Sequence, residues 1–184
     1  MILLFLADGF EEIEALTPVD VLRRAGFDVK TAAVGKGRDK TVLGAHGIPV
    51  CADLTMKEAK KLCPEPEMVI LPGGMPGAKN LDGDADVDAY VMEAYARGAY
   101  IGAICAAPMI LGKRGLLKGR RAACFPGFEK YLDGADCTGG RVETDGKIVT
   151  ACGMGAAGEF ALALLSLMKG ESAAEEMRLA ILAK

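Results

Sequence analysis

The cysteine at position 105 is the residue of this sequence whose type and surroundings best suit chemistry. It ends the apolar, strand-like run 100–104, and two alanines and Pro108 separate it from a helix-like stretch over 109–117. Small neighbours permit a sharp strand-to-helix turn that holds a side chain above a sheet. The free N–H groups and partial positive charge at the start of a helix favour a thiolate. The run therefore predicts a nucleophile elbow with Cys105 as the nucleophile.

Histidine is the usual activator of a cysteine nucleophile, and the chain contains one, His46. It lies in the turn-like run 44–47, which we expect to be far from the carboxyl ends of the strands. The simplest interpretation of His46 is an exposed turn residue. A peptidase built on a cysteine and a histidine is therefore disfavoured.

Carboxylates are the other candidates for a partner of the thiol. Glu11, Glu12 and Glu14 fall in the first turn of an expected helix over 11–25. Compensation of the helix dipole is the simplest role for Glu11 and Glu12. A carboxyl of Glu14 turned toward the thiol has two options. It can stay charged and raise the thiol pKa, or it can hold a proton and donate a hydrogen bond to a thiolate.

Two glycine-rich runs also follow expected strands. Gly73 and Gly74 come after the strand 68–71 and either form a simple turn or expose backbone N–H groups to a ligand. With the N–H of Ala106 they could form an oxyanion hole. The run 153–158 resembles GxGxxG, but no βαβ unit follows it. Close packing of a helix on the sheet is the better interpretation of that run.

Strand-like and helix-like segments alternate along the chain. The expected strands are 2–6, 27–34, 68–71, 100–104 and 121–125, with a hairpin or an edge pair over 41–52 and a hairpin over 141–152 around Asp145-Gly146. The expected helices are 11–25, 55–62 with a capping box, 84–97, 109–117, 158–169 and 172–183. Continuous apolar strands joined by helices predict a mostly parallel sheet covered on both faces. Cys105, the glycine pair and the acidic helix start then share one edge of the sheet, where such folds bind ligands.

The composition excludes several other classes of protein. The chain has 184 residues, a net charge of −3 and six cysteines without a CxxC pair. We expect one domain over 1–184, free thiols, no nucleic-acid partner, no membrane span, no metal and a cytoplasmic location. Cys124 and Cys152 lie in apolar strand-like runs and are expected to act as small hydrophobic residues.

Five segments together resemble the ThiJ/PfpI superfamily, and within it the DJ-1 branch. They are DGFEEIE (8–14), PVDVLRRAG (18–26), LPGG (71–74), AICAAP (103–108) and EFAL (159–162). Their order and spread cover nearly the whole chain. The resemblance implies an α/β fold, namely a flavodoxin-like three-layer α/β/α sandwich related to class I glutamine amidotransferases. It also implies a homodimer.

The resemblance also implies roles for individual residues. Cys105 is the reactive, easily oxidised cysteine, and Glu14 is its protonated partner acid. The residues that line a small anion pocket are Gly73, Gly74 and Ala106, and those expected near the dimer interface and the site are Arg24, His46 and Cys51. The sequence departs from close relatives at two positions, since His46 replaces a usual arginine and Phe125 stands where some relatives have a pocket histidine.

The activity implied by the resemblance is that of a glyoxalase or deglycase without a cofactor. Such an enzyme acts on small-molecule carbonyl substrates, namely α-oxoaldehydes or their early glycation adducts. The alternative is a redox sensor or chaperone that works through oxidation of Cys105 and has no dedicated catalysis. A scaffold with an inert thiol is a third option.

Overall fold

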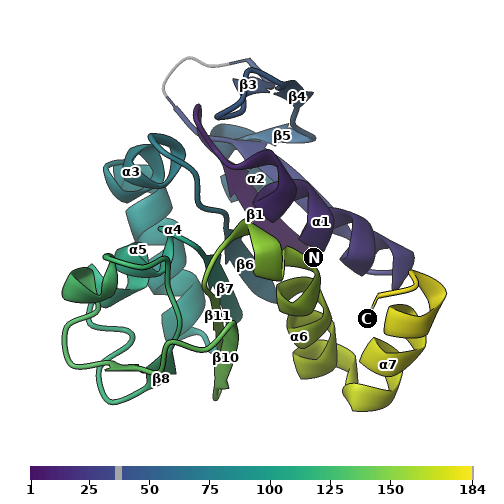
Figure 1. Cartoon of the computed structure of the whole chain (residues 1–184). Coiled ribbons are helices and arrows are strands. Elements are labelled where there is room, and N and C mark those ends of the chain that lie inside the picture. The colour runs from purple at the N-terminus through teal and green to yellow at the C-terminus, as the bar shows by residue number, and fades with distance from the viewer. Residues whose placement is uncertain (36–38, 184) are drawn as a thin grey trace.

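The computed structural model describes residues 1–35 and 39–183 and is organised around a seven-stranded sheet (Figure 1). The strand order is β10-β11-β7-β6-β1-β2-β5. The strands are β1 (Ile2–Leu6), β2 (Val29–Ala33), β5 (Leu54–Thr55), β6 (Met68–Leu71), β7 (Tyr100–Ile104), β10 (Val142–Asp145) and β11 (Ile148–Ala151). All neighbours pair in parallel except β10, which is antiparallel to β11. The predicted mostly parallel sheet is confirmed.

Helices cover both faces of this sheet and make three layers. Figure 1 shows α1, α6 and α7 together on one side, and contacts join α1 to α6 and α6 to α7. Their bounds are α1 (Glu12–Arg24), α6 (Ala157–Lys169) and α7 (Glu171–Ala180). The other side carries α2 (Met56–Leu62), α3 (Gly77–Asp82), α4 (Ala85–Ala96) and α5 (Pro108–Lys113). The predicted flavodoxin-like α/β/α sandwich is therefore confirmed.

The central strand β1 shows why the sheet needs a helical layer on each face. Leu3 and Phe5 belong to the core cluster under α2–α5, whereas Ile2, Leu4 and Leu6 belong to the cluster under α1 and α6. Each of these five side chains is at most 1% exposed. Successive side chains of a strand point to opposite faces, so an apolar strand of this kind is buried on both.

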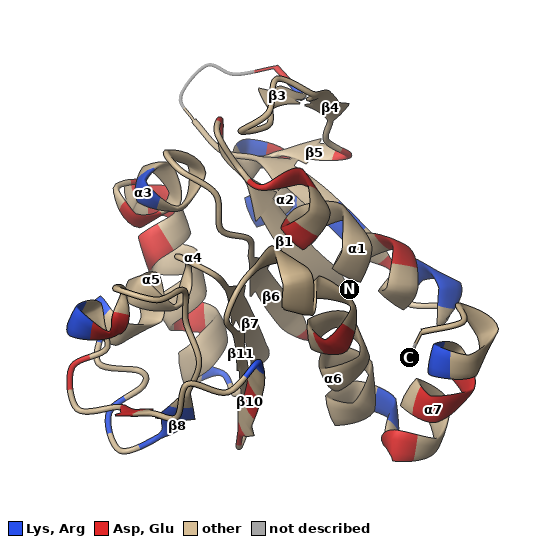
Figure 2. Ribbon diagram, viewed as in Figure 1, with Lys and Arg blue, Asp and Glu red and all other residues tan. Residues whose placement is uncertain are grey.

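Helix α1 carries the acidic residues toward the carboxyl edge of the sheet. Figure 2 shows acidic residues at the start of α1 and basic residues at its end, the arrangement that complements a helix dipole. The helix stops before Gly26, which adopts a φ of 85°. Ala15, Val19 and Leu22 pack against the sheet. That packing fixes the rotation of the helix and turns Glu14 inward.

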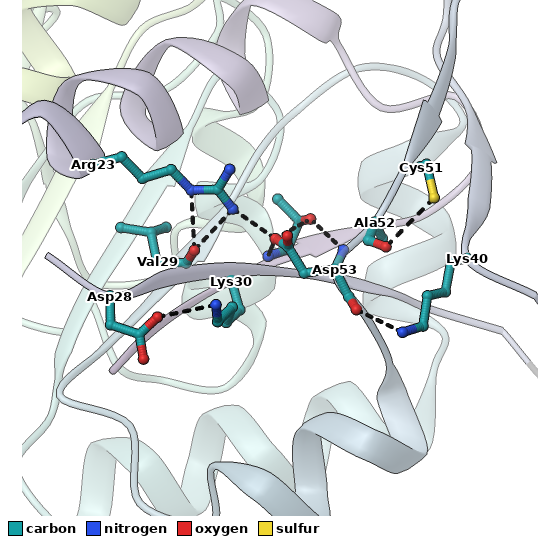
Figure 3. Close-up of polar contacts among 9 residues, drawn as sticks. Arg23, Asp28, Val29, Lys30, Lys40, Cys51, Ala52 and Asp53 are labelled. Carbon is teal, nitrogen blue, oxygen red and sulfur yellow. Dashed lines mark hydrogen bonds and ion pairs between the residues drawn. The ribbon is translucent and has the colours of Figure 1, made fainter.

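Asp53, which precedes β5, ties that edge strand to its neighbours (Figure 3). Its Oδ2 accepts hydrogen bonds from the Arg23 guanidinium at 2.6 Å, the Thr31 amide at 2.8 Å and the Thr31 hydroxyl at 2.9 Å. Lys40 donates to its backbone carbonyl at 2.7 Å. One side chain therefore links α1, β2 and the segment before β5.

Two short pairs of strands, one antiparallel and one parallel, lie outside the main sheet. The expected hairpin over 41–52 is confirmed as β3 (Thr41–Leu43) against β4 (Pro49–Cys51). The expected strand 121–125 is mostly wrong. Only β8 (Arg121–Ala122) forms, and it pairs with β9 (Asp136–Cys137) in a separate sheet. The chain turns away after Ala122 because the Phe125 amide bonds to the Cys105 carbonyl at 2.8 Å.

The helices differ from the expected ones mainly at their ends. The capping box of α2 forms between Thr55 and Glu58 as predicted. The helix expected over 109–117 ends at Lys113, because Gly115 adopts a φ of 71°. The sequence interpretation also missed the short α3 after the glycine pair. No helix in the described part of the chain is long and apolar enough to cross a bilayer.

Candidate active site

Cys105 stands on the sharp turn that the sequence predicts. It follows β7 directly and adopts a φ of 64°, a left-handed conformation that is costly for a residue with a Cβ atom. Its amide donates to the Ala151 carbonyl and its carbonyl accepts from the Phe125 amide, both at 2.8 Å. These two bonds hold the strained backbone in place. The predicted nucleophile elbow is therefore present in geometry, with the thiol half-buried.

Glu14 lies beside this thiol, under the start of α6. Its side chain is 1% exposed. The Gly73 amide donates to Oε2 at 3.0 Å, and the Met154 backbone and the Cys105 side chain also form hydrogen bonds with the carboxyl. Burial raises the pKa of Glu14 to about 7, although these hydrogen bonds oppose the rise. Glu14 therefore holds its proton far more readily than an exposed glutamate.

The pKa of Cys105 does not follow the simple expectation of a lowered value. Burial and the negative charge of Glu14 raise the pKa of the thiol to about 12, and the Gly74 and Ala106 amides oppose this rise. Two such close groups lose their protons as a pair. The first proton leaves near pH 7 and the second near pH 12. A thiolate at neutral pH therefore requires Glu14 to keep the remaining proton.

The glycine pair is required by this crowding. A Cβ atom on Gly73 would lie 2.6 Å from Oε2 of Glu14 and 2.7 Å from the Cβ of Cys105. Gly74 has a φ of 85°, and a Cβ there would lie 2.3 Å from the Glu11 amide. With no side chains in the way, the amides of Gly74 and Ala106 reach the sulfur of Cys105. Of the three residues expected to line an anion pocket, Gly74 and Ala106 direct their amides to the sulfur, whereas the Gly73 amide donates to Glu14.

Gly153 belongs to the site and was missed by the sequence interpretation. A Cβ on Gly153 would lie 3.9 Å from both the Cys105 Sγ and the Glu14 Oε1, and 3.4 Å from the Phe125 ring. Close helix–sheet packing was the wrong reason for this glycine-rich run, because a Cβ on Gly155 or Gly158 meets nothing within 4 Å. Its position two residues after the end of β11, the strand next to the cysteine strand β7, was the available signal.

The residues expected at a dimer interface do not form one group within the chain. Arg24 lies in the last turn of α1 and pairs with Asp20 at 2.8 Å. Cys51 is exposed at the end of β4, where its thiol faces the Ala52 carbonyl (Figure 3). Glu14 and Arg24 are ten residues apart on one helix, so about 15 Å separates them along its axis.

His46 corrects another expectation. It is not remote from the strand ends, because its Nδ1 lies 2.9 Å from Glu12 and 3.5 Å from Glu11. These three residues are a group in the described part of the chain whose side chains could hold a metal ion. Glu11 and Glu12 lie at the start of α1, within one turn of Glu14, and His46 lies in the loop between β3 and β4. This group was not predictable from the sequence, since the cysteine and histidine spacings of common metal sites are absent.

Both the sequence and the fold of this chain are similar to those of known proteins. The sequence model described as "DJ-1/PfpI family" matches residues 1–167. The chain belongs to the DJ-1/PfpI family. A "Parkinson disease protein 7 homolog" from Danio rerio is 33% identical over 185 residues, which cover 99% of this chain and 96% of that protein. The solved structure "Toxoplasma gondii DJ-1, oxidized" superposes with a TM-score of 0.92 at 34% identity, covering 98% of this chain and 97% of the other.

Other relatives in the DJ-1/PfpI family differ in length or name. "Protein DJ-1 homolog B" from Arabidopsis thaliana is 36% identical over 96% of this chain, but the match spans only 40% of that longer protein. A protein named "Deglycase PYRAB04690" from Pyrococcus abyssi is 31% identical, over 82% of this chain and 88% of its own length. The expected family is therefore confirmed, whereas the names of its members do not by themselves fix the activity of this chain.

Proposed function

We propose that this protein is a glyoxalase or deglycase that needs no cofactor and acts on α-oxoaldehydes or their early glycation adducts. The observation that carries the proposal is the contact between the Cys105 thiol and the buried carboxyl of Glu14, with the amides of Gly74 and Ala106 at the sulfur. A nucleophile, a proton carrier and oxyanion donors are the parts that addition to an aldehyde requires.

The proposed reaction begins with the dyad in its singly charged form. The Cys105 sulfur attacks the aldehyde carbon and forms a hemithioacetal. The amides of Gly74 and Ala106 stabilise the oxyanion, and Glu14 supplies its proton to that oxygen. Glu14 then moves a proton from C1 to C2 through an enediol, and the hydroxyl proton passes from the C1 oxygen to the C2 oxygen, which leaves a thioester. Water releases the hydroxy acid and restores the thiol, so methylglyoxal plus water gives lactate.

The comparisons support the same chemistry at a coarser level. One relative at 31% identity carries the name deglycase. Phe125, Met75 and Met154 have exposed fractions of 48%, 52% and 51%, and they lie in the segments next to Cys105, Gly74 and Glu14. A small carbonyl compound can therefore approach the thiol past apolar side chains.

Lactate production from methylglyoxal tests this proposal. The wild-type chain should convert methylglyoxal, and Cys105→Ala should lower the rate by at least about 100-fold, since it removes the nucleophile. Cys137→Ser is the matched control, because Cys137 is an exposed thiol on β9. Equal rates of lactate production by the wild type and Cys105→Ala would contradict the proposal.

A redox sensor is the second candidate, and the hydrogen bonds of the Gly74 and Ala106 amides to the Cys105 sulfur favour it. The Gly74 and Ala106 amides at the sulfur, together with a protonated Glu14, would hold the oxygens of a sulfinate. Mild peroxide should then add two oxygen atoms to Cys105 and leave the chain folded. Intact-mass measurement of the wild type and Cys105→Ala distinguishes this from oxidation at other thiols.

A further inference from the structure

A second group of ionisable side chains lies at the start of α1, outside the thiol site. Glu11 and Glu12 come from the first turn of the helix, and His46 comes from the loop between β3 and β4. The nearest ligand-type atoms of the three residues all lie within 4.8 Å of one another. An imidazole nitrogen and two carboxylate oxygens from separate segments therefore converge on one point.

The separations in this group match those between ligands of one metal ion. His46 Nδ1 lies 2.9 Å from Oε2 of Glu12 and 3.5 Å from Oε2 of Glu11. Zinc binds nitrogen and oxygen at about 2.0–2.2 Å, so neighbouring ligands of a tetrahedral ion are about 3.4 Å apart. The two separations from His46 lie within about 0.5 Å of this spacing, and all three ligand atoms lie within 4.8 Å of one another.

The backbone around the group holds its members in place. The His46 amide donates to Oε1 of Glu12 at 2.8 Å, which leaves Oε2 for a second partner. The Ala45 amide bonds to the Phe10 carbonyl at 2.8 Å and fixes the loop against the start of α1. A Cβ on Gly44 would lie 2.2 Å from Oε1 of Glu12, so the loop approaches the carboxylate as closely as a glycine allows.

The charge and exposure of the group also suit a cation. Glu12 is 7% exposed and Glu11 13%, whereas the His46 side chain is 68% exposed. Glu11 is the N-cap residue of α1, yet its side chain makes no capping hydrogen bond. Within the described residues, the recorded ion pairs of both carboxylates are with His46 alone. Two carboxylates therefore face at most one positive charge, and the His46 side chain is exposed in the single chain.

We propose that Glu11, Glu12 and His46 form a binding site for a divalent transition-metal ion of the zinc type. The protein ligands are Oε2 of Glu11, Oε2 of Glu12 and Nδ1 of His46, and water completes the shell on the exposed side. This set resembles open zinc sites, which keep three protein ligands and one exchangeable position. Nδ1 must be free of a proton to ligate the ion, so binding to a protonated His46 releases that proton.

This site stands independently of the carbonyl chemistry at Cys105. Its ligands do not include the thiol or Glu14, and ion binding can be measured without a substrate. Cysteines also bind zinc, so the test uses a background in which the exposed Cys51 and Cys137 are serine and Cys105 is alanine. Isothermal titration with zinc chloride then measures the remaining sites under reducing conditions.

The background protein should bind one zinc ion, and His46→Arg in that background should weaken binding by at least about 100-fold. Arginine keeps a positive charge near the carboxylates but cannot ligate the ion. Because His46 is exposed, this change should leave the fold intact, as circular dichroism will show. Glu11→Gln provides a second ligand variant, and Glu175→Gln on α7 is the control that should bind as the background does.

X-ray absorption at the zinc edge identifies the ligands directly. Nitrogen and oxygen neighbours at about 2.0–2.2 Å with no sulfur support the proposal. A sulfur neighbour would assign the ion to the remaining cysteines and overturn it. Failure of the background protein to bind zinc, or equal binding by both the His46→Arg and Glu11→Gln variants, would overturn it as well.

Discussion

Cys105 and Glu14 behave as one ionisable unit because they share a buried position and a hydrogen bond. Neither pKa has meaning for one residue alone, since ionisation of Glu14 is itself a cause of the raised pKa of Cys105. Between about pH 7 and pH 12 the pair carries a single negative charge. The amides of Gly74 and Ala106 stabilise that charge on sulfur, whereas the backbone hydrogen bonds from Gly73 and Met154 stabilise it on the Glu14 carboxylate.

The pH dependence of alkylation follows from this pair. The first proton leaves as pH rises through about 7, so the reaction of Cys105 with iodoacetamide should rise through that pH and then level off. In Glu14→Gln the acid cannot titrate, so the inflection near pH 7 should vanish. Peptide-resolved mass spectrometry over pH 5–10 measures both profiles. An inflection near pH 7 that survives in Glu14→Gln would contradict the shared proton.

At this scale the sequence identified the two central residues but not their electrostatics. Cys105 and Glu14 were predictable because a strand end and a helix start bring them to the same edge. The raised thiol pKa was not predictable, because it depends on how deeply both groups are buried. The contact of His46 with Glu12 was also hidden, since it depends on where a hairpin loop folds back.

The glycine loop after β6 positions the site because bare backbone fits where a side chain would not. Gly73→Ala should remove the activity and lower the free energy of unfolding by about 1–3 kcal/mol, since a Cβ there collides with Glu14 and Cys105. Gly155→Ala is the matched control, because its Cβ meets nothing within 4 Å. Urea unfolding and lactate assays of the two variants are compared. A Gly73→Ala protein as active and stable as the control would refute this role.

Asp53 provides a second test at this scale, namely of the link between α1, β2 and the segment before β5. Burial opposes its ionisation, but hydrogen bonds from Thr31 and the charge of Arg23 hold the pKa of Asp53 below its usual value. Asp53→Asn should therefore reduce the free energy of unfolding by about 1–2 kcal/mol at pH 7.

The difference between Asp53→Asn and the wild type should disappear in acid. A carboxyl with a lowered pKa contributes stability above its unfolded pKa of about 3.8–3.9, and this is lost as pH falls through the folded value. Asp28→Asn is the control, since its pair with Lys30 at 3.3 Å is exposed (Figure 3). Equal urea midpoints for Asp53→Asn and the wild type at pH 7 would rule out the link.

The elements themselves were largely predictable where hydrophobic patterns were long. The strands 2–6, 68–71 and 100–104 match β1, β6 and β7 because buried parallel strands are continuously apolar. The run 121–125 is also mostly apolar after Arg121, but its first two residues pair with β9 outside the main sheet. An apolar segment is expected to be buried, but burial alone does not determine which strand the segment pairs with.

At the scale of the molecule, α1 presents an apolar outer side that a homodimer would cover. Ile13 and Leu16 on α1 and Ile48 on the adjoining hairpin loop are 48%, 39% and 52% exposed. We expect a dimer in sedimentation experiments and a monomer after Leu16→Asp, since a charge on this side opposes association. Leu179→Asp on α7, 59% exposed, is the control that should stay dimeric. A monomeric wild type would contradict the expectation.

The relative reactivity of the six thiols is the most direct test of the site as a whole. Cys51 and Cys137 are exposed, whereas Cys105 is half-buried. Accessibility alone would therefore make Cys51 and Cys137 react first. Site-resolved mass spectrometry after brief, substoichiometric peroxide at pH 8 should show Cys105 modified at least about tenfold faster than either, because its pair with Glu14 supplies the thiolate. Modification of Cys51 or Cys137 at the same rate as Cys105 would contradict the account.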